Sequence, residues 1–120
     1  MAATVMGSAR MRLGHSELVV RPVGLGCMGM SQYYGHADDT QSIKTIRSAI
    51  DLGVDFLDTS DVYGAADIGT AQKARGFGHN ERMIGAAISG LLEIIVLATK
   101  FGAKSTTPMT ESPSTDALNM

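Results

Sequence analysis

The stretch GLGCMGM (residues 24–30) places three glycines at the spacing G-x-G-x-x-G, which in Rossmann domains lies against a dinucleotide pyrophosphate. In that fold the helix starts within the glycine motif, because its N-terminus binds the phosphates. Here no helical pattern begins before about Asp38, and the carboxylate that ends the next strand, Asp58, lies 29 positions past Gly29. The Rossmann pattern requires an acidic residue after about 20 positions. These glycines therefore indicate close backbone approach in another fold.

On either side of this stretch, segments with strand and helix patterns alternate. We predict a short hairpin around Pro22 and a strand at 22–26, a helix capped by Asp38, Asp39 or Thr40 and stopped by Gly53, a strand at 54–58, a helix capped by Asn80 and extending to Leu91, and a strand at 94–98. The last strand is continuously apolar, which is typical of a strand buried on both faces of a parallel sheet. This order predicts an α/β fold built from βαβ units.

The bulk composition is that of an ordinary globular protein. The chain has 120 residues, 44% of them hydrophobic, and a net charge of -2, which favours neither a nucleic-acid nor a membrane partner. The single Cys27 excludes an internal disulfide and suggests a cytoplasmic protein. We expect a flexible extension at 1–10, a structured part at 11–102, and a disordered tail rich in Ser, Thr and Pro at 103–120.

The residues with chemical potential lie where the predicted strands end. The segment GLGCM follows the first strand, Asp58 ends the second, and Lys100 follows the third. In a (β/α)8 barrel the carboxyl ends of the strands carry the active site. This placement therefore predicts the first three strands and two helices of such a barrel, which is too few to close it.

Four blocks of the sequence resemble the N-terminal third of the aldo/keto reductases, over residues 12–102. They are LVVRPVGLGCMGMS (18–31), GVDFLDTSDVYG (53–64), HNERMIGAAI (79–88) and IVLATKFG (95–102). Members of that family are (β/α)8 barrels that use NADPH, sometimes NADH, to reduce aldehydes and ketones. The resemblance implies a small carbonyl substrate and three residues of the family's catalytic tetrad, namely Asp58, Tyr63 and Lys100.

The resemblance also implies a cofactor contact at the first strand. The family's GLG-x-M segment, which here includes Gly26, Cys27 and Met28, lies against the nicotinamide end of the cofactor, near Asp58. The sulfur-containing side chains have an alternative role in irregular barrel packing. No cluster of His, Cys, Asp or Glu has the spacing of metal ligands, so we predict no metal site.

The chemistry implied for these residues is acid catalysis of hydride transfer. A carbonyl oxygen gains negative charge as hydride reaches the carbon, and Tyr63 would protonate it. An ordinary phenol has a pKa of about 10, and a nearby ammonium such as Lys100 lowers it by stabilising phenolate. Asp58 would keep Lys100 charged and oriented.

The sequence departs from the family in ways that bear on activity. It holds three of eight strands, lacks the tetrad histidine, and lacks the later strands that carry most cofactor contacts. We expect the chain alone to be inactive, with an aggregation-prone edge at its third strand. Two alternatives are a cofactor-sensing binding subunit, like the potassium-channel β subunits of this family, and a non-functional product of a truncated or wrongly assigned reading frame. Substrate identity, the choice between NADPH and NADH, and oligomeric state stay open.

Overall fold

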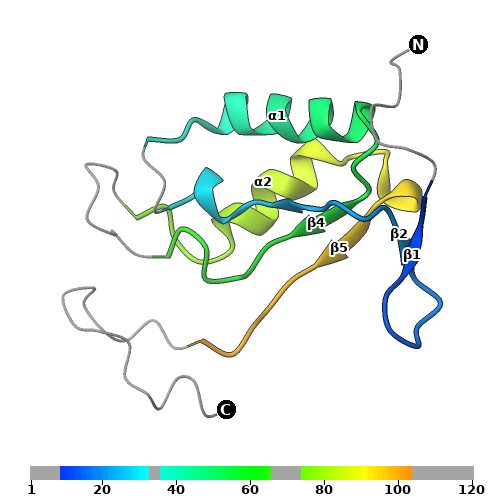
Figure 1. The fold of residues 1–120 in the computed structure, drawn as a ribbon. Coiled ribbons are helices and arrows are strands. Elements are labelled where there is room, and N and C mark those ends of the chain that lie inside the picture. The colour runs from blue at the N-terminus through cyan, green and yellow to red at the C-terminus, as the bar shows by residue number, and fades with distance from the viewer. Residues whose placement is uncertain (1–8, 33–35, 66–73, 104–120) are drawn as a thin grey trace.

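A three-stranded parallel sheet with two helices forms the centre of the computed structural model, which describes residues 9–32, 36–65 and 74–103. The sheet order is β3 (Leu25–Gly26), β4 (Phe56–Asp58) and β5 (Val96–Ala98). Each consecutive pair is joined by a helix, α1 (Asp39–Asp51) or α2 (His79–Ala87). The helices pack on each other and on one face of the sheet (Figure 1). The predicted α/β class is confirmed, and the described strands form an open arc rather than a closed barrel.

The N-terminal hairpin lies before Pro22 rather than around it, which corrects the predicted position. Its strands are β1 (Met11–Arg12) and β2 (Val19–Val20), and they pair antiparallel. The turn between them uses Gly14, whose φ of 59° is in the left-handed region that favours glycine. The strand predicted at 22–26 is shortened to β3, Leu25–Gly26.

The buried carboxylate of Asp55 anchors this hairpin to the amino end of β4. One Asp55 oxygen accepts from Arg10 Nη1 at 3.1 Å, and the other accepts from the Arg21 backbone N–H at 2.8 Å. Arg10, the last residue of the predicted extension, forms an ion pair with Asp55. The other residues expected there, up to residue 8, lie outside the described part of the chain, and so does the tail from residue 104.

Helix α1 follows its predicted boundaries. Asp38 is the N-cap, and its side chain accepts a hydrogen bond from the Thr40 backbone N–H at 3.0 Å. The helix ends at Asp51, after which Gly53 adopts a φ of 109° and donates from its N–H to the Ile50 carbonyl. Ile46, on the buried face, is 0% exposed.

Replacing Asp38 by alanine is expected to lower the free energy of unfolding by about 0.5–2 kcal/mol, because the Thr40 N–H loses its cap. Urea denaturation followed by circular dichroism measures this loss. Asp51→Ala, which changes an exposed carboxylate at the opposite end of the same helix, is the control. An equal loss in both variants would contradict a specific capping role for Asp38.

Helix α2 begins two residues earlier than predicted, and its cap is different. Gly78, with a φ of 75°, is the N-cap and makes no side-chain cap hydrogen bond. Asn80 was predicted to cap the helix, but it lies inside the first turn and is 0% exposed. His79 is the first helical residue. The helix ends at Ala87, several residues before the predicted end at Leu91.

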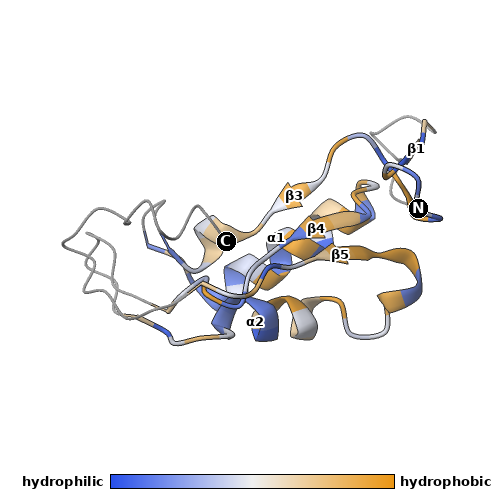
Figure 2. Ribbon diagram, turned by 90° about the horizontal axis from the view of Figure 1, so that it is seen from below, coloured by the Kyte–Doolittle hydropathy of each residue, from blue (hydrophilic) through white to orange (hydrophobic). Residues whose placement is uncertain are grey.

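Strand β5 is shorter and more exposed than its apolar sequence predicts. Ile94 belongs to a short 3-10 helix, η2 (Leu92–Ile94), and Leu97 is 42% exposed. The prediction of burial on both faces is therefore wrong for this chain. Among the described residues, β5 is an edge strand, with β4 as its hydrogen-bonded neighbour. Figure 2 shows that β5 and most of the segment leading into it consist of hydrophobic residues.

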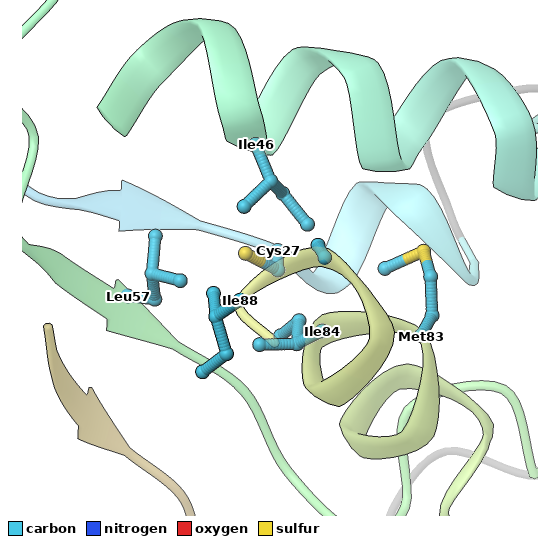
Figure 3. Packing of buried hydrophobic residues seen from close by; sticks show 7 residues of the cluster. Cys27, Ile46, Leu57, Met83, Ile84 and Ile88 are labelled. Atoms are coloured by element: carbon cyan, nitrogen blue, oxygen red, sulfur yellow. The ribbon is translucent and has the colours of Figure 1, made fainter. Parts of the chain in front are cut away.

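The hydrophobic core lies between the sheet and the two helices. Ile46 of α1, Leu57 of β4 and Ile84 of α2 are each 0% exposed and meet in this layer (Figure 3). Leu57 points toward the helices, so its neighbours Phe56 and Asp58 point to the opposite face of the sheet, because side chains alternate along a strand. The hydrophobic core therefore lies on one face of the sheet, and the polar side chains of the candidate site lie on the other face and at the strand ends. The cluster consists of Cys27, Ile46, Leu57, Met83, Ile84, Ala87 and Ile88.

Candidate active site

The ammonium of Lys100 is the centre of the polar group at the carboxyl ends of the strands. Its Nζ donates to both oxygens of Asp58, at 3.0 and 2.9 Å, and to the Thr59 carbonyl at 2.6 Å. It also lies 4.9 Å from the centroid of the Tyr63 ring. The structure thus brings together the three residues that the sequence singled out. Parallel pairing of β3, β4 and β5 causes this, because all three strands end on the same side (Figure 1).

The electrostatics of this group favour a charged lysine. Partial burial of Lys100 acts to lower its pKa, but the hydrogen bond to Asp58, the contact with Tyr63 and the charge of Asp58 outweigh it, so the pKa is raised above 10.5. The side chains of Lys100 and Asp58 are 51% and 46% exposed, so water screens the pair strongly. The pair therefore orients the ammonium more than it stabilises the fold.

Asp58→Asn is expected to lower the pKa of Lys100, because the carboxylate that favours the ammonium is lost. A lysine whose pKa is raised on folding stabilises the folded state below its unfolded pKa of 10.5, and this stabilisation disappears as pH rises through the folded-state pKa. The stability difference between wild type and variant should therefore shrink above pH 10.5. Denaturation at several alkaline pH values measures this, and a constant difference would contradict the assignment.

The loop after β4 determines where Tyr63 lies. It is anchored on both sides: the Asp61 N–H donates to the Lys100 carbonyl at 3.1 Å, and the Gly78 N–H donates to the Asp61 carbonyl at 2.7 Å. The Tyr63 carbonyl accepts from the Asn80 N–H at 3.4 Å. Tyr63 is therefore held between the end of β5 and the start of α2, although it lies in a loop.

The three residues expected at the cofactor occupy different environments. Gly26 pairs with Asp58 across β3 and β4, is exposed, and has no atom within 4 Å of the point where a Cβ would lie. Met28 is half-buried in a short 3-10 helix, η1 (Met28–Met30). Cys27 is 0% exposed, and its thiol belongs to the hydrophobic core. Burial, and to a smaller extent the charge of Asp58, raises the pKa of Cys27 to about 11. The Cys27 thiol therefore acts as a packing group in the core rather than as a contact for the cofactor.

Gly24, the first glycine of the motif, is explained by packing against the neighbouring strand. A Cβ at this position would lie 3.0 Å from the Phe56 carbonyl oxygen and 3.1 Å from its ring. Both distances are shorter than most Cβ contacts, so glycine favours the close approach of this segment to β4. The motif therefore combines a tightly packed glycine, Gly24, with an open one, Gly26.

Sequence reasoning missed a polar network behind the site. Its centre is Asn80, which contacts Thr59 and Ser31, and it continues from Ser31 through His79 to Asp39. Asp39 also pairs with Arg75. One signal could have revealed it, because Asn80 precedes Met83 and Ile84 by three and four positions and so shares their buried face.

Metal-ligand clusters and membrane-spanning helices are both absent from the described residues. No group of three or more His, Cys, Asp or Glu side chains in residues 9–32, 36–65 and 74–103 is arranged to hold a metal ion. Within the same residues, no helix is long and apolar enough to cross a membrane.

Comparison with known proteins decides the family. The model of the aldo/keto reductase family matches residues 22–118. The chain belongs to the aldo/keto reductase family. The resemblance seen in the sequence began ten residues earlier, at 12, and ended at 102, whereas the family match continues into the Ser/Thr/Pro-rich segment.

Solved structures of aldo-keto reductases share the fold. AKR11C1 from Bacillus halodurans, in its holo form, is 30% identical with a TM-score of 0.62, over 82% of this chain. PA4992 from Pseudomonas aeruginosa, assigned to the aldo-keto reductases, is 25% identical with a TM-score of 0.62, over 85% of this chain. The thermostable aldo-keto reductase Tm1743, solved with the inhibitor epalrestat, shares the fold at 24% identity and a TM-score of 0.57, over 76% of this chain.

This aldo/keto reductase chain spans about a third of the length of those relatives. The matched regions cover 28% of AKR11C1, 36% of PA4992 and 30% of Tm1743. The described residues therefore contain three parallel strands and two helices of the family barrel.

Proposed function

We propose that Asp58, Tyr63 and Lys100 form the proton-donating site of a nicotinamide-dependent carbonyl reductase. The observation that carries the proposal is the position of Lys100 Nζ, which is bound to Asp58 and lies 4.9 Å from the ring centroid of Tyr63. An ammonium beside the ring supplies positive charge close to where negative charge would develop on the phenol oxygen during proton transfer. The substrate class is a small aldehyde or ketone.

The open face beside Asp58 fits a nicotinamide cofactor. Gly26 presents exposed backbone with empty space where a side chain would be, and Asp58 is its partner on the neighbouring strand. Gly26, Met28 and Asp58 would line the nicotinamide end of the cofactor, with Cys27 contributing at most its backbone. Reduced nicotinamide, when bound, supplies the hydride for the carbonyl carbon.

Each residue of the chain then has one task. The Tyr63 hydroxyl donates its proton to the carbonyl oxygen as negative charge develops there. Lys100 stabilises the phenolate that remains, and Asp58 holds Lys100 charged and directed at the ring. All three act mainly on the transition state, so their loss should reduce kcat more than binding.

We expect activity only within a complete barrel. The described residues supply three strands, and the matched region covers 28% of AKR11C1. A site with side chains 46% and 51% exposed does not exclude water, which a reductase must do to protect hydride transfer. The chain of 120 residues on its own should therefore show no turnover.

A chimera tests the proposal. Residues 11–102 replace the matching segment of AKR11C1, and NADPH oxidation is followed with a broadly accepted aromatic aldehyde. We expect the chimera to reduce the aldehyde and the isolated chain to show none of this activity. A chimera that folds and binds NADPH without turnover would refute the proposal and favour the cofactor-sensing alternative. Active AKR11C1 under the same conditions is the control for the assay.

A further inference from the structure

The side chain of Asn80 is completely buried beneath the proposed catalytic site, and all of its hydrogen bonds reach other segments. Its Oδ1 accepts from Thr59 Oγ1 at 2.5 Å. Its Nδ2 donates to the Cys27 carbonyl at 2.8 Å and to Ser31 Oγ at 2.7 Å. One amide therefore connects the first turn of α2 with the residue after β3, the residue after β4 and the end of η1.

The bond to Thr59 connects Asn80 with Lys100. Thr59 is 0% exposed, and its carbonyl accepts from Lys100 Nζ at 2.6 Å. Its backbone N–H donates to the Ala98 carbonyl at 2.9 Å, which keeps the ends of β4 and β5 in register. Because Asn80 fixes the Thr59 side chain, it also fixes the peptide that holds the ammonium.

The remaining bonds connect Asn80 with Asp58 and Tyr63. Cys27, whose carbonyl binds the Asn80 amide, donates from its N–H to the Asp58 carbonyl at 3.0 Å. The backbone N–H of Asn80 donates to the Tyr63 carbonyl at 3.4 Å. Asn80 therefore contacts the Tyr63 backbone directly, and it reaches the Asp58 backbone through Cys27 and the Lys100 ammonium through Thr59.

The neighbours of Asn80 determine the direction of its hydrogen bonds. Ser31 Oγ accepts from Asn80, so the Ser31 hydroxyl is free to donate to His79 Nδ1, 2.8 Å away. In this arrangement the His79 hydrogen is on Nε2, which donates to Asp39 Oδ1 at 3.0 Å and lies 3.3 Å from Arg75 Nη1. Ser31, His79 and Asp39 have the order of a hydrolytic triad, but Ser31 is only 5% exposed and is already bonded to Asn80. The group orients the amide instead of attacking a substrate.

We infer that Asn80 is a positioning residue, which holds Lys100 and Tyr63 in their relative places without touching substrate. The inference rests on the function proposed above. An amide suits the task because the site needs two donors and an acceptor from one side chain, and aspartate or leucine cannot supply both. Among the described residues, every buried side-chain nitrogen and oxygen has a partner, so loss of Asn80 would leave several unpaired.

Titration of Lys100 in the full chain of 120 residues tests this inference without requiring catalysis. The lysines are labelled with carbon-13, the Lys100 signal is assigned by its loss in Lys100→Met, and its titration midpoint is measured by NMR. Wild type and Asp58→Asn define the two limits of the scale. We expect Asn80→Ala, and to a smaller extent Thr59→Val, to shift the midpoint downward toward Asp58→Asn. Met83→Ala, a truncation in the same helix that faces only the hydrophobic core, should leave it unchanged.

Each outcome decides the inference. A downward shift in Asn80→Ala or Thr59→Val, with none in Met83→Ala, supports it. If Asn80→Ala fails to fold, Thr59→Val alone decides. Wild-type midpoints in both variants would overturn it, and so would an equal shift in Met83→Ala, which indicates general loosening. Coincident titration of all lysines in wild type would overturn it too. Activity of the chimera is measured separately, so failure of the proposed function and failure of this inference give different results.

Discussion

Replacement of Tyr63 by phenylalanine in the chimera is expected to lower kcat for carbonyl reduction by about 10²- to 10⁴-fold, the usual contribution of a general acid. The ring stays in place and only the hydroxyl is lost, so NADPH binding and the Lys100–Asp58 contact should be kept. Initial rates at saturating aldehyde measure the loss, and quenching of NADPH fluorescence measures binding.

A double variant sharpens this test. If Lys100 acts through the Tyr63 phenol, Lys100→Met should lower kcat strongly on its own but add little to Tyr63→Phe, because residues that act as a unit are not additive. Additive losses would instead give Lys100 a separate role. Wild-type rates in Tyr63→Phe would exclude Tyr63 as the proton donor.

Truncation of Leu57 to alanine is expected to lower the free energy of unfolding by about 2–5 kcal/mol, the usual cost of a buried leucine, which is a large part of a small domain's stability. Leu57 is 0% exposed and meets both helices in the core. Urea denaturation of the full chain, followed by circular dichroism, measures the loss.

The chain offers a matched control on the neighbouring strand. Leu97 is also a leucine, and it pairs with Leu57 across β4 and β5, so both side chains lie on the same face of the sheet. Leu97, however, is 42% exposed. Leu97→Ala should cost much less. Equal losses would mean that Leu97 is covered in solution, for example by association of chains through β5, and would change the view of β5 as an open edge.

The order of elements and the location of the candidate site could be predicted because both depend on local patterns. Apolar residues at helical spacing and the cap candidates Asp38, Asp39 and Thr40 placed the start of α1 within two residues, and Asp38 is the cap. Parallel strands end on one side, and this alone brought Asp58 and Lys100 to the same edge, where they are 2.9 Å apart. Asp58 and Lys100 are 42 positions apart in the sequence, and the strand topology alone predicts that they lie near each other.

The features that sequence could not reveal depend on which segments meet. Asn80 has the residue type of a helix cap, and only the convergence of β3, β4 and η1 makes it a buried connector. The hairpin was misplaced because the turn at Gly14 gives a weaker signal than Pro22. The burial predicted from the apolar pattern of β5 was wrong, whereas the open edge predicted from the number of strands is present among the described residues.

The alternation along β4 couples the stability of this chain to its chemistry. Leu57 faces the core, while Asp58, the next residue, faces the site. Successive side chains of a strand point to opposite faces of the sheet. A deletion or insertion of one residue just before β4 would therefore turn the Asp58 carboxylate toward the hydrophobic core and Leu57 toward the face of Lys100. Length changes here should therefore be eliminated by selection even where point substitutions are accepted. Libraries meant to alter specificity should vary side chains at this strand and reserve insertions for the loop beyond Tyr63.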